Sequence, residues 1–228
     1  MIELNDLRYE LKYLIQKPDI LTLEQRFKHV MQRDSHAADD GYFIRSLYFD
    51  DIENSSYHQK MNGQMRRVKY RIRYYDFDDS AIFFEKKIKE NNKIAKQSFM
   101  ITRDEVDTLL NREPRFLLKK GDLGVDVYRR WTEKALRPKM IVDYRRMPYT
   151  YPAGNVRITF DTGLHMSEVV DGMFDERSAM IPVMNDQGAI MEVKYGQFIP
   201  AHIKDLLALD NSVRMAISKY TMCREINL

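Results

Sequence analysis

Charged and apolar residues alternate one by one along several segments of this chain, and this pattern restricts the possible folds more than any other feature. Between positions 67 and 74, four basic residues alternate with Val68, Tyr70, Ile72 and Tyr74. Successive side chains of a β-strand point to opposite faces, so the segment predicts a strand with one charged and one apolar face. The same period predicts strands at 8–13, 84–89, 156–161 and 191–195, and we also expect strands at 44–49 and 140–145.

Helical spacing separates the predicted strands. Pro18 opens a helical segment that runs to Met31, and Thr102 with Glu105 forms a capping box at the start of another. We expect two further helices at 122–137 and 200–209. The sequence contains no internal repeat, low-complexity tract or linker, so it predicts a single domain over residues 1–228. Its class is α+β, mainly antiparallel.

The charged strand faces differ from ordinary solvent-exposed faces, which mix Lys and Glu with Thr, Ser and Gln. For any single strand, a half-buried sheet with a solvent-exposed polar face explains the alternation. Four basic residues in line repel one another, however, unless an anion or facing carboxylates compensate. A sheet closed into a barrel with these faces inward would form a charged lumen for a polyanion, because Arg makes bidentate contacts to phosphate and Lys supplies point charges. The carboxylates that could hold a hard divalent cation in this lumen are Glu10, Glu85, Asp143, Asp161 and Glu192.

The composition excludes several classes of protein. Of the 228 residues, 44% are hydrophobic and 31% charged, which is enough apolar material for a core and does not indicate disorder. The net charge of +3 is small for a general nucleic-acid coat. No segment reaches the roughly 18 to 20 apolar residues of a transmembrane helix, and no secretory signal or zinc-finger, Rossmann or P-loop motif is present. The single cysteine, Cys223, predicts a packed free thiol in a reducing compartment, so we expect a soluble, cytoplasmic protein.

Eight short motifs follow one another in an order that resembles the VTC domain, the polyphosphate polymerase branch of the triphosphate tunnel metalloenzymes. The first motif is Arg8-Tyr9-Glu10-Leu11-Lys12-Tyr13. The others lie at 45–50, 69–74, 84–87, 137–145, 155–161, 190–195 and 218–220. The resemblance implies an antiparallel tunnel barrel with a charged lumen and helices packed outside, which binds ATP and a tripolyphosphate or polyphosphate chain along its axis.

The resemblance also assigns roles to the residues that match its motifs. The catalytic residues, which would hold the phosphates, are Lys12, Arg71, Arg73, Lys87, Arg145, Arg157, Lys194 and Lys219. Further phosphate-binding residues are Arg8, Lys69, Lys89 and Lys96. The metal ligands, for Mn²⁺ or Mg²⁺, are Glu192, Glu10 and Glu85, of which the last two could instead orient Lys and Arg side chains across the lumen. We expect Arg146 and Arg66 on the outer face of the sheet.

The implied activity is metal-dependent phosphoryl transfer, first of all polyphosphate synthesis from the γ-phosphate of ATP. An inorganic or nucleoside triphosphatase and a non-catalytic polyphosphate-binding module stay open as alternatives. Arg8 stands where many tunnel metalloenzymes have the first Glu of Glu-x-Glu-x-Lys, which argues against a typical triphosphatase or adenylyl cyclase. The SPX domain and membrane helices of the eukaryotic relatives have no counterpart in the sequence, so we expect a stand-alone catalytic domain, and a membrane partner is left open.

Nucleic-acid binding by an open basic sheet is a further alternative. The near-neutral net charge and the absence of aromatic residues on the charged strand faces disfavour it, because base stacking needs exposed rings. We therefore expect no nucleic-acid partner.

Overall fold

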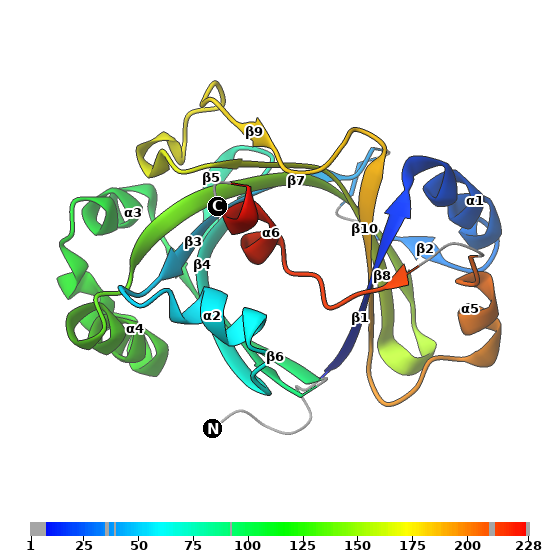
Figure 1. Ribbon diagram of the computed structural model, residues 1–228, viewed down its shortest axis with the longest axis horizontal. Helices are drawn as coiled ribbons and strands as arrows, with labels where there is room; N and C mark the ends of the chain where they lie inside the picture. The colour runs from blue at the N-terminus through cyan, green and yellow to red at the C-terminus, as the bar shows by residue number, and fades with distance from the viewer. Residues whose placement is uncertain (1–7, 35–36, 39, 92, 210–212, 227–228) are drawn as a thin grey trace.

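In the part of the chain that the structure describes, eight antiparallel strands close into a ring (Figure 1). The computed structural model describes residues 8–34, 37–38, 40–91, 93–209 and 213–226. The ring order is β7, β3, β4, β5, β6, β1, β10, β8, and the pairing of β8 with β7 closes it. The bounds are β1 (Arg8–Gln16), β3 (Tyr42–Asp50), β4 (Arg66–Tyr75), β5 (Asp78–Glu90), β6 (Lys93–Ile101), β7 (Arg137–Tyr151), β8 (Val156–Ser167) and β10 (Gly188–Tyr195). Two-residue strands extend the sheet: β2 (Gln32–Arg33) on β7, β9 (Ile181–Pro182) on β8 and β11 (Val213–Arg214) on β1.

Every strand expected from the sequence lies in this sheet, and each is longer than its predicted segment. The mainly antiparallel α+β class is thereby confirmed. Strand β6 was not predicted, because its apolar residues fall on both faces. Ile94 and Met100 occupy even positions, whereas Ala95 and Phe99 occupy odd ones, so no alternation is visible.

Helices cover the apolar outer faces of the ring on two sides (Figure 1). On one side these are α3 (Arg103–Leu110), the 3₁₀ helix η2 (Pro114–Lys119) and α4 (Gly121–Glu133), and on the other α1 (Lys17–Phe27) and α5 (Ala201–Leu206). Trp131 of α4 packs with Phe49 and Phe84, and Phe27 of α1 packs with Phe160. Short 3₁₀ turns, η3 (Ala153–Asn155) and η4 (Val170–Gly172), lie beside the ends of β7 and β8.

The four expected helices are present, the three with predicted ends are shorter than expected, and the predicted capping box is confirmed. Thr102 Oγ1 accepts a hydrogen bond from the Glu105 N–H at 3.2 Å, and Glu105 Oε2 accepts one from the Thr102 N–H at 2.9 Å. Through the described ranges of the chain, no helix is both long and apolar enough to cross a membrane.

A third apolar cluster lies on the inner side of the ring and contains α6 (Lys219–Glu225). Tyr220 and Cys223 of this helix are buried with Tyr48 and Tyr144. Figure 1 shows α6 within the outline of the ring, next to α2 (Ser55–Met61), which it contacts. Neither helix was expected from the sequence. Burial raises the pKa of the Cys223 thiol to about 12, which agrees with the packed free thiol predicted for this position.

Candidate active site in the lumen

The charged strand faces line a cavity of about 370 Å³ inside the ring. Basic side chains converge on it from β1, β4, β5, β7, β10 and α6, while their apolar strand neighbours enter the outer cores. A smaller cavity of about 270 Å³ shares lining residues with the first: Glu10, Arg71, Arg73, Lys87 and Lys194. Beside the inner apolar cluster, the lumen therefore contains charge-lined cavities.

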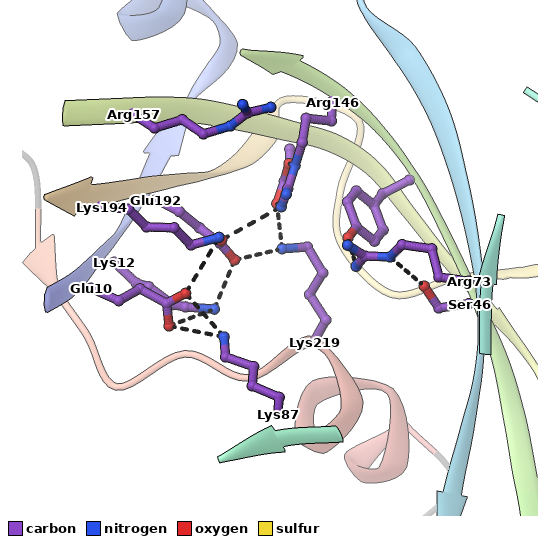
Figure 2. A network of polar contacts seen from close by, with 12 residues as sticks. Glu10, Lys12, Ser46, Arg73, Lys87, Arg146, Arg157, Glu192, Lys194 and Lys219 are labelled. Atoms are coloured by element: carbon purple, nitrogen blue, oxygen red, sulfur yellow. Dashed lines mark hydrogen bonds and ion pairs between the residues drawn. The ribbon is translucent and has the colours of Figure 1, made fainter. Parts of the chain in front are cut away.

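Glu192 of β10 contacts four basic side chains in the network of Figure 2. Its Oε1 accepts hydrogen bonds from Lys12 Nζ at 2.7 Å and from Lys219 Nζ at 3.1 Å. Its Oε2 lies 3.3 Å from Lys194 Nζ and 3.5 Å from Arg146 Nη2. These cations belong to β1, α6, β10 and β7, so one carboxylate connects distant parts of the chain across the lumen. A buried carboxylate is tolerated only with such compensation.

A second carboxylate, Asp161 of β8, binds two of the same cations. Its two oxygens each accept a hydrogen bond of 2.7 Å from the guanidinium of Arg146. Lys219 Nζ also donates to Asp161 Oδ2. The bidentate contact fixes the plane of the Arg146 guanidinium. Arg146 and Lys219 are thus held in place before any ligand binds.

Two further carboxylates orient basic side chains along the lumen. Glu10 accepts hydrogen bonds from Lys87 Nζ at 3.0 and 3.2 Å. Glu85 accepts from Arg71 Nε at 2.7 Å and from Lys96 Nζ at 2.8 Å. These contacts are the ones expected if Glu10 and Glu85 orient Lys and Arg side chains. Their alternative role as metal ligands stays a prediction.

Burial and neighbouring charges shift the pKa values in this network. Burial opposes ionisation of Glu192, but Lys12, Lys219 and Lys194 outweigh it and hold the pKa of Glu192 well below its ordinary value. Burial lowers the pKa of Lys87 to about 8, because the attraction of Glu10 offsets only part of the desolvation. The carboxylates of the lumen are therefore ionised at neutral pH and attract cationic groups.

A divalent cation would find carboxylate oxygens here but no complete protein cage. Among the residues that the structure describes, no three acidic, His or Cys side chains gather into a group that could hold a metal ion. Mg²⁺ is commonly bound through one or two carboxylates, with substrate phosphates supplying more of the oxygens. Glu192 fits this mode of binding, because its hard oxygens line the cavity and a phosphate chain could take over the surrounding cations.

Most of the residues assigned from the resemblance meet in this lumen. The larger cavity is lined by Lys12, Arg71, Arg73, Lys87, Lys194, Lys219, Lys69, Lys89, Glu10 and Glu192. The smaller cavity adds Arg8, Lys96 and Glu85. Their roles in catalysis, phosphate binding and metal binding stay predictions, but the structure brings them together.

We expected Arg145 in the lumen and Arg146 on the outer face of the sheet, and the structure shows the reverse. Arg145 is exposed, with its Nη1 2.7 Å from Asp40 Oδ2, whereas Arg146 is buried and lines the cavity. Tyr144 lines the cavity too, and the pairing of β7 with β8 shifts between Asp143 and Arg145. Met140, Ile141 and Val142, earlier in β7, are apolar on both faces, so alternation in the sequence did not determine which arginine points inward.

Arg157 of β8 lines neither cavity, although it pairs in register with Lys194. Its guanidinium lies 2.6 Å from the carboxylate of Asp34 and 3.2 Å from the hydroxyl of Tyr42. The catalytic role of Arg157 stays a prediction.

Two basic residues of the larger cavity were not singled out from the sequence. Lys60 is on α2 and Arg214 is on β11, and neither element shows the charged alternation that reveals the main strands. Only their contribution to the wall of the folded ring connects them with the other cations.

A closed antiparallel ring with inward-facing Arg and Lys, held by buried carboxylates, defines a tunnel-type domain suited to binding a chain of phosphates. The comparison with protein families agrees, because the chain belongs to the VTC domain family, whose sequence profile matches residues 7–227. This confirms the resemblance and indicates a triphosphate-related activity. No curated protein sequence matches the chain significantly.

Solved structures share the fold at low sequence identity. The PH1819 protein from Pyrococcus horikoshii OT3 is 12% identical with a TM-score of 0.51, over 96% of this chain and 99% of that one. A putative adenylate cyclase from Bacillus halodurans is 14% identical with a TM-score of 0.48, over 85% of this chain and 83% of that one. At such identities the likeness concerns the fold alone.

Proposed function

We propose that this protein catalyses metal-dependent phosphoryl transfer on tri- and polyphosphate, and that it synthesises polyphosphate from the γ-phosphate of ATP. The observation that carries the proposal is the cavity whose basic walls converge on Glu192. Membership of the VTC domain family supports it.

The chain's own residues would act by binding and charge neutralisation. Phosphoryl transfer requires little covalent chemistry from the protein, so positioning and electrostatic stabilisation provide most of the catalysis. Arg71, Arg73 and Arg146 offer planar donors to phosphate oxygens, and Lys12 and Lys219 supply point charges. Together they would hold the triphosphate extended and its γ-phosphorus exposed to attack.

The reaction transfers one phosphoryl group to a growing chain. A terminal oxygen of the chain forms a bond to the γ-phosphorus, the bond from that phosphorus to the β,γ-bridging oxygen breaks, and ADP leaves with the bridging oxygen. A divalent cation held through Glu192 would polarise the γ-phosphoryl group. The same side chains neutralise the charge that develops on the leaving ADP.

The test is incubation of the protein with ATP and Mn²⁺ or Mg²⁺, followed by ³¹P NMR. Growth of an internal-phosphate signal is expected, and Glu192→Gln should abolish it because the carboxylate charge is lost with little change of shape. Glu133→Gln, the same chemical change at the exposed end of α4, is the matched control and should leave the signal unchanged.

Two other outcomes contradict polyphosphate synthesis. Orthophosphate as the only product means that water attacks and the protein is a triphosphatase. Absence of turnover together with tight tripolyphosphate binding means a non-catalytic binding module.

A further inference from the structure

Exposed methionine side chains gather around one end of the larger cavity. Met61, the last residue of α2, is 51% exposed, and Met65, in the loop before β4, is 73% exposed. Met215, which follows β11, is 47% exposed and lines the cavity together with Lys60, the residue before Met61. We call these three methionines the methionine rim. Exposed apolar side chains that gather in one place among polar residues are typical of an interaction surface.

Backbone hydrogen bonds hold the loop that carries two of these methionines. The Gln64 N–H donates to the Gln59 carbonyl of α2 at 3.0 Å. The Asn91 N–H, in the turn between β5 and β6, donates to the Met65 carbonyl at 2.9 Å. The loop is thus attached to α2 on one side and to the β5–β6 turn on the other, while the side chains of Met61 and Met65 stay exposed.

The segments that carry the methionine rim are basic. Residues 54–75 contain six Lys and Arg residues and no Asp or Glu, and residues 213–224 contain three and none, although the whole chain has 34 acidic residues. Arg66 and Arg214, next to Met65 and Met215 in the sequence, are exposed. Glu90 is the register partner of Arg66 and offsets only part of this charge. The rim therefore combines exposed apolar side chains with an excess of positive charge.

The opposite end of the same strands is acidic. Strand β4 begins at Arg66 beside the rim and ends at Tyr75. Three aspartates follow this end, Asp76, Asp78 and Asp79. An extended strand rises about 3.3 Å per residue, so β4 separates the two ends by about 30 Å, well beyond a Debye length of about 8 Å at physiological salt. An anionic surface would therefore attract the rim and repel the other end.

The surface of a membrane that contains anionic lipids fits this combination of side chains. Basic residues are attracted to acidic headgroups, and apolar side chains are stabilised when they enter the boundary between headgroups and acyl chains. Methionine suits such a boundary, because its unbranched side chain adapts its shape. The three methionines lie on α2, on the loop before β4 and after β11. A fluid lipid surface accepts side chains on separate segments without a matching partner surface.

We propose that the methionine rim is a docking surface for membranes with anionic lipids, and that it holds this end of the cavity against one face of the bilayer. The proposal goes beyond the reaction in the lumen and does not depend on it.

The test is co-sedimentation of the protein with vesicles of phosphatidylcholine, alone or mixed with phosphatidylglycerol. The native protein should bind the anionic vesicles about tenfold more strongly than the neutral ones, and added salt should weaken this binding. Met61→Ser/Met65→Ser should weaken it about tenfold without a change of charge, because the burial of apolar area is lost. Met100→Ser/Leu118→Ser, which removes two comparably exposed apolar side chains from β6 and η2, is the matched control and should bind like the native protein.

A fluorescent label tests which end of the ring faces the lipid. The native Cys223 is buried, so a thiol-reactive dye whose emission depends on polarity labels an introduced cysteine selectively. The dye on Met65→Cys should shift its emission to shorter wavelength when anionic vesicles are added. The dye on Asp79→Cys, at the acidic end, should show no shift.

Contrary results overturn the proposal in distinct ways. If the native protein binds neither kind of vesicle, or binds both equally, anionic lipid is not its partner. If Met61→Ser/Met65→Ser binds as tightly as the native protein, the methionines do not enter the lipid. If the dye shifts on Asp79→Cys and not on Met65→Cys, the opposite end faces the membrane. If tripolyphosphate releases the native protein from the vesicles, the cations of the lumen and not the rim hold the lipid.

Discussion

A single buried carboxylate, Glu192, organises much of the lumen through its contacts with four cations. Removing one member of such a buried network leaves the others without compensation, which costs more than the loss of an exposed ion pair. Arg145 and Arg146 illustrate the contrast between an exposed and a buried ion pair, because these neighbours have the same side chain in opposite environments. Arg146 binds Asp161 in the interior, and Arg145 binds Asp40 at the surface.

The first prediction compares the same substitution at the two positions. Arg146→Ala should lower the free energy of unfolding by about 3–5 kcal/mol, since it leaves the buried Asp161 short of a partner. Arg145→Ala should change the free energy of unfolding by less than about 1 kcal/mol, as is usual for an exposed pair. Urea denaturation measures both. Equal losses at the two positions would contradict the inward placement of Arg146.

Helix α6 connects the inner apolar cluster with the charged network. Ser218 caps it by accepting a hydrogen bond from the Thr221 N–H at 3.3 Å, and Ser218 Oγ also accepts one from Lys69 Nζ. Lys219 reaches Glu192 and Asp161, while Tyr220 donates to Asp50 Oδ2 at 2.7 Å. The same short helix therefore packs against the ring and supplies cationic groups to the cavity, so its stability and the geometry of the site depend on each other.

The second prediction concerns this helix. Tyr220→Phe keeps the aromatic side chain but removes its hydrogen bond to the buried Asp50. The free energy of unfolding should therefore decrease by about 1.5–3 kcal/mol, the usual range for a hydrogen bond to a charged group. Tyr57→Phe is the control, since the Tyr57 hydroxyl forms no hydrogen bond to the described residues. Chemical denaturation followed by circular dichroism measures both variants. An unchanged midpoint for Tyr220→Phe would mean that Asp50 does not hold α6.

Across the whole molecule, the ring places opposite charges inside one wall, with β6 and β1 joined at only two described residue pairs. Such a structure depends on the ionisation of its carboxylates. Burial opposes ionisation of Glu85, but Arg71, Arg73 and Lys96 outweigh it and lower its pKa. Glu10 and Glu192 shift in the same direction.

The third prediction is a loss of stability in acid. The folded-state pKa values of these glutamates lie below the ordinary value of 4.5, so the unfolded chain binds protons first as the pH falls. Their contribution to stability is present above pH 4.5 and is lost progressively below it. Urea midpoints measured from pH 7 to pH 3 should therefore decrease in the acid range, and Glu85→Gln should show a smaller decrease. A flat profile would contradict the depressed pKa values.

Local periodicity was enough to predict every strand of the ring except β6, and much of the candidate site. Because side chains alternate strictly along a strand, Lys12, Arg71, Lys87 and Lys194 could be assigned to charged faces, and the structure places all four on the cavity wall. The capping box at Thr102 was equally visible, since it involves residues only three positions apart.

What the sequence by itself determined about this protein is the set of charged and apolar strand faces, and only the tertiary structure decided which residues meet inside the ring. The pairing of β7 with β8 shifts by a residue before Arg145. Beyond this shift, which involves two strands and not one, Arg146 is the arginine that lines the lumen. Lys60 and Arg214 reach the same cavity from a short helix and a two-residue strand, whose local sequences contain no sign of it. Alternation is a property of neighbours in the chain, whereas the wall of a lumen is made by contacts between segments far apart in it.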